Sequence, residues 1–556
     1  MTSGEARAAP DTLEPPGIEG RGGAAAAGDS IAVAAWTVVS RVTGVARFAA
    51  IGAVLGPTFF GNTYQFTNSL PNQIYYGFLG GSLLSSLLVP ALVRHLDAGD
   101  RDGCRRVAGG FLGASLLAVV AVLPIAVLLG PLALGLTASA GGTGIGESQE
   151  QVGRWLILMF APQVFCYGLV AAATAVMNAR RRFALAAAAP ALENVGILAV
   201  LGLSAVLFGT GADLGQVRPA QLLLLGLGTT GAVVLHAGTQ WWGARRAGIV
   251  LVPRVGWRDP EVRRVIRRAL PSLAQAGLVA LQVLTLLVLA NRVPGGVVAF
   301  QLALSFYYLA IALGATPVAL SLLPRLARMH QNGRSTVFRD TVVRGLGQAF
   351  FLTVPAAAGY LVLAGPLARA LAFGRMDTAE GVTMVAASLA ALTVAVLGQT
   401  AFLVATYASY AREDTRSPLR SMLLQAAACL VLLSLAPRVH GTAVLVAIGL
   451  AFSASVALGA AHLLTRVLRG LGRGTVRLAP SLLRIVAGAG AMAAPAWLAA
   501  AGASRWAGAP IGVATGIVTG AAVFLGLQAL WRTPELAALT GGLRHVRGRA
   551  GSVADV

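Results

Sequence analysis

The sequence is poor in charge and in the residues from which soluble enzymes build their sites. Only 12% of its 556 residues are charged, whereas 56% are hydrophobic and the mean hydropathy is +0.74. No soluble globular domain has this composition, so the chain falls in the membrane class. It contains no lysine, and its 43 arginines give a net charge of +22. Because these arginines fall between apolar runs, we interpret them as a topology signal and expect no nucleic-acid partner.

Motifs for metal binding and catalysis are also missing. The three cysteines, Cys104, Cys166 and Cys429, are far apart, and the six histidines follow no ligand spacing. We therefore predict no disulfide, no metal and no cofactor. The chain has no P-loop, no nucleophile elbow and no paired catalytic carboxylates. We predict no catalytic residues and a transporter driven by a substrate gradient, ions or the membrane potential.

Long apolar runs dominate what is present. Fourteen segments are long enough to cross a bilayer, which takes about 20 residues. They cover residues 31–56, 60–93, 106–138, 153–179, 183–209, 219–243, 266–291, 297–324, 342–373, 380–410, 418–436, 440–465, 481–502 and 508–531. Loops on one side of these segments carry 32 arginines, and loops on the other side carry seven. This alternation predicts an all-α polytopic membrane protein with both termini in the cytoplasm.

An internal repeat relates the two halves of the chain at a spacing of about 234 residues. Pro90 in LLVPALVRH corresponds to Pro324 in SLLPRLARMH, and Pro131 corresponds to Pro366. Because the spacing spans six segments, both halves have the same orientation, as in transporters that rock one half against the other. We expect two pseudo-symmetric six-helix lobes followed by two additional helices.

The domain boundaries follow from these segments. Residues 1–29 are rich in alanine, glycine and proline and carry mixed charge, which predicts a disordered cytoplasmic tail and no signal peptide. The remaining parts are an N-terminal lobe over 30–243, a cytoplasmic linker over 244–265, a C-terminal lobe over 266–467, two helices over 480–531 and a cytoplasmic tail over 532–556.

Two arginines interrupt the first apolar segment. An arginine near the centre of a bilayer costs at least about 2.5–3.5 kcal/mol, so it usually faces a cavity or an anionic partner. Arg41 and Arg47 are about 120° and about 9 Å apart on a helix, and both can border one wide cavity. Alternatively, one pairs with an internal acid and the other extends to a surface. Glu193 is the clear candidate acid, either as a structural counter-ion or as a proton- or ion-coupling site.

Two pairs of tyrosines lie in corresponding segments of the repeat. Tyr75 and Tyr76 belong to the second segment, and Tyr307 and Tyr308 belong to the eighth. Packing or an interfacial belt is the ordinary role of such pairs. Stacking against a sugar, or lining a polar cavity, is the functional alternative.

Several motifs together resemble the MurJ/MviN lipid II flippases, a family of the multidrug/oligosaccharidyl-lipid/polysaccharide exporter superfamily. They are SRVTGVAR (40–47), FTNSLPN (66–72), LVPAL (88–92), NARRRFALAAAAPALEN (178–194), SLLPRLAR (321–328), LAGPLARALAFGR (363–375) and YAREDTRSP (410–418). The resemblance covers roughly residues 30–530. It implies fourteen helices, of which two six-helix lobes surround a cationic cavity and the last two form a groove for the lipid tail. It also implies transport of a polyprenyl-pyrophosphate-linked glycan, most plausibly the peptidoglycan precursor lipid II, from the inner to the outer leaflet of the bacterial cytoplasmic membrane.

The chain departs from that family at residues that the resemblance places in the cavity. Tyr75 and Tyr76 replace an arginine pair, Asn62 replaces an aspartate, and Ser305 aligns with an arginine. The substrate-binding residues implied are Arg41, Arg47, Asn62, Tyr75, Tyr76 and Ser305, with the two arginines on the pyrophosphate. Three functions stay open: a lipid II flippase, an exporter of another lipid-linked glycan or amphipathic molecule, and a transport-inactive scaffold for cell-wall synthesis proteins. Membrane lipids are expected partners in each case.

Overall fold

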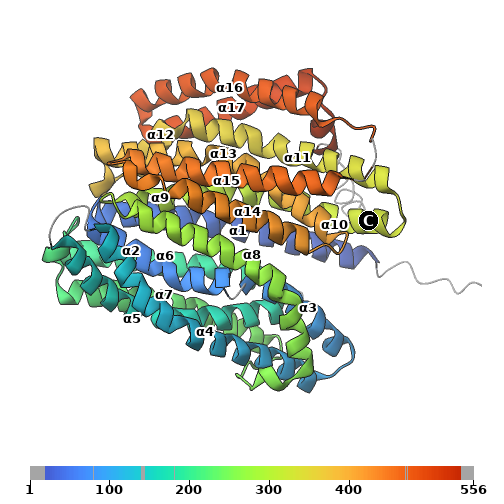
Figure 1. Cartoon of the computed structure of the whole chain (residues 1–556), viewed down its shortest axis with the longest axis horizontal. Coiled ribbons are helices and arrows are strands. Elements are labelled where there is room, and N and C mark those ends of the chain that lie inside the picture. Colours follow the sequence, from blue (N-terminus) through green and yellow to red (C-terminus); the bar gives the residue numbers. More distant parts are fainter. Residues whose placement is uncertain are drawn as a thin grey trace, which may run out of the picture.

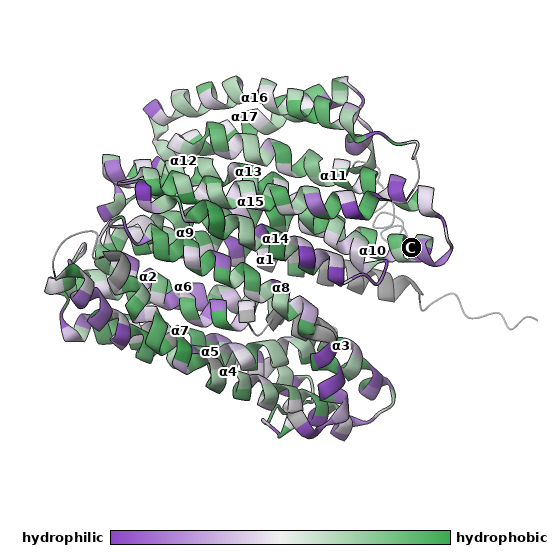
Figure 2. Ribbon diagram, viewed as in Figure 1, coloured by the Kyte–Doolittle hydropathy of each residue, from purple (hydrophilic) through white to green (hydrophobic). Residues whose placement is uncertain are grey.

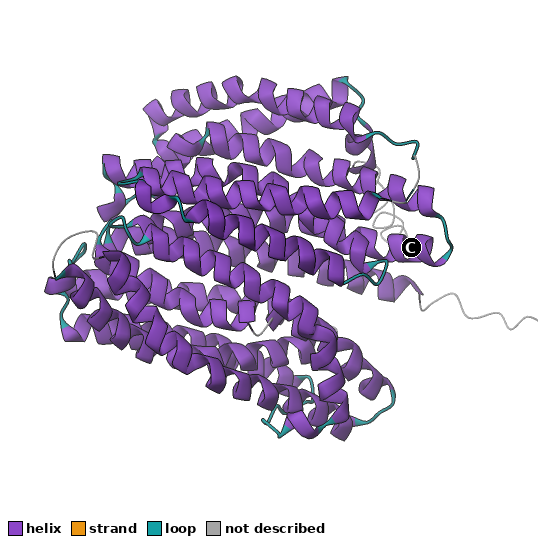
Figure 3. Cartoon of the chain, viewed as in Figure 1, coloured by secondary structure: helices purple, strands orange, loops and turns teal. Residues whose placement is uncertain are grey.

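The computed structural model describes residues 19–78, 81–138, 144–180, 182–469, 471 and 474–539. Helices joined by short loops make up this part of the chain, and no strand occurs in it (Figure 3). Thirteen helical stretches in the described ranges are long and apolar enough to cross a membrane. Hydrophobic residues dominate their middle portions, and hydrophilic residues gather mainly toward their ends (Figure 2). The predicted all-α membrane architecture is confirmed.

The N-terminal lobe is one bundle. Its elements are α1 (Glu19–Leu55), α2 (Phe59–Asn72), η1 (Gln73–Phe78), α3 (Gly81–Asp97), α4 (Arg101–Ala138), α5 (Ile145–Ala179), α6 (Phe183–Phe208) and α7 (Pro219–Arg246). Small residues allow its helices to approach closely, as is common in membranes. Gly196 of α6, for example, lies so near α7 that an added Cβ would be 2.7 Å from the Cβ of Ala232.

The C-terminal lobe repeats this arrangement. It contains α8 (Pro260–Ala290), α9 (Gly296–Ala310), η5 (Ile311–Ala315), α10 (Thr316–Gln331), α11 (Ser335–Val362), α12 (Ala364–Leu371), α13 (Ala379–Tyr410), α14 (Arg416–Leu433) and α15 (Ala443–Leu468). The last two long helices, α16 (Leu478–Ala507) and α17 (Ala509–Leu530), pack on each other and on the outer side of this lobe, against α11 and α12 (Figure 1).

The second apolar segment contains a π-helical turn, and it is not among the thirteen stretches because its residues 79–80 lie outside the described residues. It consists of α2, the π-helical turn η1 and α3. The corresponding segment of the other lobe also contains a π-helical turn, η5, between α9 and α10. Tyr75 and Tyr76 lie within η1, and Tyr307 and Tyr308 directly precede η5. Such turns bend helices and often occur at functional sites, so the repeat preserves a bend as well as a sequence pattern.

The lobes meet at the end of the bundle that carries the arginine-poor loops. There Asn62 of α2 donates through Nδ2 to the carbonyl of Val293 at 2.8 Å and accepts from the Val297 amide at 3.0 Å. Gln149 of α5 and Asn291 exchange two side-chain hydrogen bonds of 2.9 and 3.0 Å. Toward the arginine-rich end the bundles diverge, with α3 and α10 on opposite sides and α8 crossing between them (Figure 1).

The ends of the chain and the linker differ from the expected boundaries. Helix α1 begins at Glu19, inside the segment expected to be a tail, since the alanine run 24–27 favours a helix. Residues 1–18 and 540–556 lie outside the described residues. Glu535 is buried and accepts a hydrogen bond from Ser481 of α16, so the second tail starts as packed structure. The linker is anchored on α4, where the Arg254 amide donates to the Gly109 carbonyl at 2.9 Å.

Candidate functional site

A buried carboxylate organises the interior of the N-terminal lobe. Glu193 lies ten residues into α6, about 15 Å from the start of the helix, and is only 7% exposed. Its Oε1 accepts a hydrogen bond of 3.0 Å from the Tyr167 hydroxyl of α5. Its Oε2 is 2.7 Å from Nδ1 of His236 on α7. A carboxylate at this depth persists only with partners of this kind, because the bilayer supplies none.

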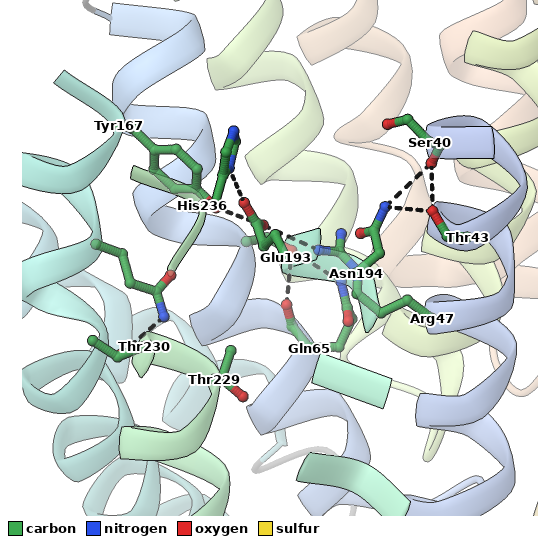
Figure 4. A network of polar contacts seen from close by, with 12 residues as sticks. Ser40, Thr43, Arg47, Gln65, Tyr167, Glu193, Asn194, Thr229, Thr230 and His236 are labelled. Atoms are coloured by element: carbon green, nitrogen blue, oxygen red, sulfur yellow. Dashed lines mark hydrogen bonds and ion pairs between the residues drawn. The ribbon is translucent and has the colours of Figure 1, made fainter. Parts of the chain in front are cut away.

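Arg47 of α1 is the cation of this cluster. Its Nη1 lies 3.4 Å from Glu193 Oε1, and its side chain is 14% exposed (Figure 4). The guanidinium also lies over the Phe48 ring, 4.8 Å from the centroid. Its Nε is buried and has no hydrogen-bond partner in the described structure. Arg47 therefore uses only part of its donor set on Glu193, and the rest is available to an additional anionic group.

A second contact fixes α1 against α6. Asn194, next to Glu193, donates through Nδ2 to the Ser40 carbonyl and to Thr43 Oγ1, both at 3.2 Å (Figure 4). Gly44 lies on the same face, where an added Cβ would be 3.6 Å from that amide nitrogen. The side of α1 that bears Arg47 is thereby held toward Glu193, while Arg41 points elsewhere.

Arg41 is exposed and forms no ion pair among the described residues. The same half of α1 also exposes Trp36, Val38, Val39 and Val42. Of the two alternatives for the arginine pair, the structure shows one arginine bound to an internal acid and one without such a partner.

The other expected substrate-binding residues are not gathered around Arg47 in one pocket. Tyr75 is buried behind the cluster and stacks on Tyr167, with ring centroids 6.0 Å apart and planes 27° apart. Asn62 lies at the lobe junction, where its amide bonds to Val293 before α9 and to Val297 in the first turn of α9. Ser305 is half-buried on α9 and donates to the Leu302 carbonyl of its own helix at 2.6 Å. The side chain of Tyr76 lies outside the described residues.

Sequence reasoning missed His236 and Tyr167. His236 was judged only against metal-ligand spacing, to which it does not conform. The depth of His236 in the bundle is the property that could have indicated the contact. His236 lies ten residues before the end of α7 and Glu193 ten residues after the start of α6, so both are about 15 Å from the same end of the bundle. Adjacent antiparallel helices bring side chains of equal depth together. The described residues also contain no group of three or more histidine, cysteine or acidic side chains able to hold a metal.

A family model described as "Lipid II flippase MurJ" matches residues 51–512 of the chain. The chain belongs to the MurJ family of lipid II flippases. Members of this family are transporters, and the protein is accordingly a transporter and not an enzyme. The resemblance drawn from the sequence motifs is confirmed.

Individual relatives agree with this membership. A protein of Rhizobium meliloti named "Probable lipid II flippase MurJ" is 29% identical over 504 residues, which cover 89% of each chain. A protein of Haemophilus influenzae with the same name is 27% identical over 400 residues, covering 69% of this chain and 76% of the relative.

Solved structures show the same fold. A structure described as "Lipid II flippase MurJ, inward closed conformation" superposes with a TM-score of 0.66 at 16% identity, covering 90% of this chain and 98% of the other. An inward-facing multidrug-resistance MATE transporter of the MOP superfamily gives a TM-score of 0.61 at 13% identity, covering 80% and 99%. The two-lobed transporter fold is therefore shared with both MurJ and MATE proteins.

Proposed function

We propose that this protein moves lipid II, a polyprenyl-pyrophosphate-linked glycan, from the inner to the outer leaflet of the bacterial cytoplasmic membrane. The observation that carries the proposal is the match of the MurJ family model to residues 51–512, which leaves only the ends of the chain outside it. The joined arginine-poor end and the diverging arginine-rich end support an alternating-access cycle. The distribution of arginines among the loops supports a topology with both termini in the cytoplasm.

Arg41 and Arg47 contact the diphosphate in this proposal. Guanidinium groups suit phosphate because their planar donors bind two oxygens at once. Arg47 retains unused donors beside Glu193, and Arg41 is exposed on the same helix. Glu193 is the proposed ion-coupling residue, since it holds Arg47 and His236 together inside the membrane.

The remaining residues of the proposed site act at different stages. Asn62 becomes free to meet the substrate only when the hydrogen bonds at the lobe junction break. Tyr75 acts through Tyr167, on which it stacks, and Tyr76 and Ser305 complete the set. A groove beside α16 and α17 is the proposed place for the lipid tail, since these helices pack outside the six-helix repeat.

Complementation tests this function. The resident lipid II flippase of a bacterium is depleted while this chain is expressed as wild type or with Arg41→Ala or Arg47→Ala. We expect rescue by the wild type and loss of rescue by both variants. Arg154→Ala is the matched control, because Arg154 is exposed and its ion pair in the described part of the chain is with Glu150, one turn away. Failure of the wild type to rescue, despite normal membrane expression, would rule out lipid II as the substrate.

An exporter of a different lipid-linked glycan or amphipathic molecule is the second candidate. It is favoured by Tyr75, which stands where the family has an arginine and is buried rather than available to a phosphate. Rescue failure combined with Arg41-dependent transport of another amphiphile would support it. A scaffold for cell-wall synthesis proteins would instead tolerate both arginine variants and depend on the cytoplasmic loops.

A further inference from the structure

The cluster around Glu193 contains a histidine, His236, with one ring nitrogen that can still accept a proton. His236 is 2% exposed, and its Nδ1 is bound to the Glu193 carboxylate at 2.7 Å. An ionised carboxylate only accepts hydrogen bonds, so Nδ1 carries the proton in this contact. The other ring nitrogen, Nε2, is buried and has no hydrogen-bond partner in the described part of the chain. A neutral imidazole in this arrangement presents a vacant proton acceptor inside the membrane.

The charges of the cluster balance only while Arg47 stays in place. One guanidinium and one carboxylate, with a neutral imidazole, sum to zero. The other titratable side chains around the pair among the described residues are Tyr64 from α2, Cys166 and Tyr167 from α5, and Tyr75 from η1, which stacks on Tyr167. None of these four supplies a positive charge, so they cannot replace Arg47 as the partner of Glu193.

Arrival of a phosphate group at Arg47 would disturb this balance. The guanidinium would turn its donors toward the phosphate oxygens and leave Glu193, 3.4 Å away, without its cation. An uncompensated carboxylate in a buried site is strongly unfavourable. One proton on Nε2 of His236 restores neutrality, because imidazolium then donates to the carboxylate from a position that is already hydrogen-bonded.

We propose that His236 takes up one proton when a diphosphate draws Arg47 away from Glu193, so that substrate binding and proton binding are linked. The proton comes from bulk water and forms an N–H bond at Nε2, and no other bond in the protein breaks. This inference rests on the proposed binding of a diphosphate by Arg47. It deepens the role of Glu193 by naming the bound ion as a proton and its acceptor as the neighbouring imidazole.

The proposal predicts the direction in which the affinity for the diphosphate changes with pH. A ligand whose bound state holds one more proton than its free state binds more tightly as the pH falls. With one proton, the dissociation constant changes at most about tenfold for each pH unit. Affinity for the diphosphate should therefore weaken as the pH rises through the range in which the free cluster is unprotonated.

Calorimetry on the full chain in lipid nanodiscs tests the proposal. The probe is farnesyl-diphospho-N-acetylglucosamine, a diester whose phosphates stay ionised across the pH range, titrated in two buffers of different ionisation enthalpy. We expect the wild type to take up close to one proton per ligand. His236→Asn, which keeps a donor for Glu193, and Glu193→Gln should bind the probe with no proton uptake, and Glu193→Gln should bind more tightly because Arg47 is released.

A matched control is available in the other lobe. His462→Asn removes a histidine that is bonded to Ser421 and has no acidic partner among the described residues, and it should leave the uptake at one proton. Binding by the wild type with the same heat in both buffers would overturn the linkage and leave the proposed flippase intact. Uptake that persists in His236→Asn would overturn the assignment to the imidazole. No binding of the probe by the wild type would remove both the proposed substrate class and this inference.

Discussion

The two lobes bury polar groups of different character at the fifth helix of each repeat. In the N-terminal lobe Glu193 of α6 holds a cation and a histidine. In the C-terminal lobe Gln425 of α14, which follows Glu193 by 232 residues, donates to the side-chain carbonyl of Gln282 on α8 at 3.3 Å. The same spacing of 232 residues relates the paired tyrosines of η1 to those before η5.

Because of this difference, the two contacts respond differently to pH and to the displacement of a partner. A pair of amides is neutral and stays neutral at every pH, so it contributes packing and one hydrogen bond. A carboxylate held between arginine and histidine changes its energy whenever either partner is displaced. The most buried ion pair of the described structure, between Arg47 and Glu193, lies in the N-terminal lobe. The fold is repeated, but its buried charge is not.

Replacing Arg47, the cation of the buried pair in the N-terminal lobe, should have the largest effect. Arg47→Ala leaves Glu193 buried without its cation, which costs up to about 3–5 kcal/mol in systems of this kind before any proton uptake by His236. We expect a large fall in the thermal unfolding midpoint of the purified protein, together with loss of flipping. Arg41→Ala should also abolish flipping but leave the midpoint near that of the wild type, because Arg41 is exposed.

A double variant tests whether the unpaired carboxylate of Glu193 causes the loss of stability in Arg47→Ala. Arg47→Ala combined with Glu193→Gln removes both charges, so the midpoint should recover while flipping stays absent. Equal midpoints for the Arg47→Ala and Arg41→Ala variants would contradict the buried pair.

Placing a carboxylate in the C-terminal lobe should show that this lobe cannot support one. Gln425→Glu would bury an acid beside Gln282, whose side chain carries no charge. We expect a loss of about 2–3 kcal/mol, measured as a lower unfolding midpoint that recovers partly at acidic pH when the acid is neutralised. Gln425→Met keeps the volume without the charge and should unfold close to the wild type. A stable Gln425→Glu variant at neutral pH would erase the contrast between the lobes.

Loosening the junction tests whether the lobes are held together at the arginine-poor end. Asn62→Ala removes two buried hydrogen bonds to Val293 and Val297, worth about 1–2 kcal/mol. Amide hydrogen exchange at residues 291–297 should become faster. Ser69→Ala is the control, since Ser69 bonds within its own helix to the Gln65 carbonyl. Unchanged exchange in Asn62→Ala would argue that other contacts hold the lobes.

The smallest effect is expected at the arginine-rich end of α8. Glu261 accepts from Arg94 at 3.0 Å and contacts Nε2 of His95 at 2.9 Å, which joins α8 to α3. Arg94 is 68% exposed, so solvent screens much of this pair. Glu261→Gln should cost about 0.5–1 kcal/mol and leave flipping nearly normal. A loss of activity comparable to that of Arg47→Ala would instead make this contact part of the transport cycle.

Most of the fold could be predicted from composition and periodicity. Apolar runs of bilayer length and alternating arginine counts led to membrane helices, and the 234-residue spacing led to two lobes. The π-helical turn in the second segment could not be predicted in this way. Hydropathy does not distinguish α2, η1 and α3 from a straight helix, since a π-helical turn changes hydrogen bonding and not composition.

Only part of the candidate site could be predicted from the sequence. Arg47 and Glu193 could be singled out because charge is costly in a membrane, and their pairing was one of two alternatives. Asn62 and Tyr75 were selected from the resemblance, yet the structure engages one at the lobe junction and buries the other behind Tyr167. Motif alignment identifies positions on a scaffold, but the direction of each side chain depends on the local helix rotation.

The sequence by itself determined the class of molecule, because a bilayer accepts only long apolar helices and sorts arginine to one side of them. It also determined that charge inside the first helix needs a partner. Only the tertiary structure decided which partner: α1, α5, α6 and α7 bring Arg47, Tyr167, Glu193 and His236 to one depth across 189 residues of chain. Contacts between distant segments depend on how helices rotate and stack, and that information is distributed over every packing face in the lobe.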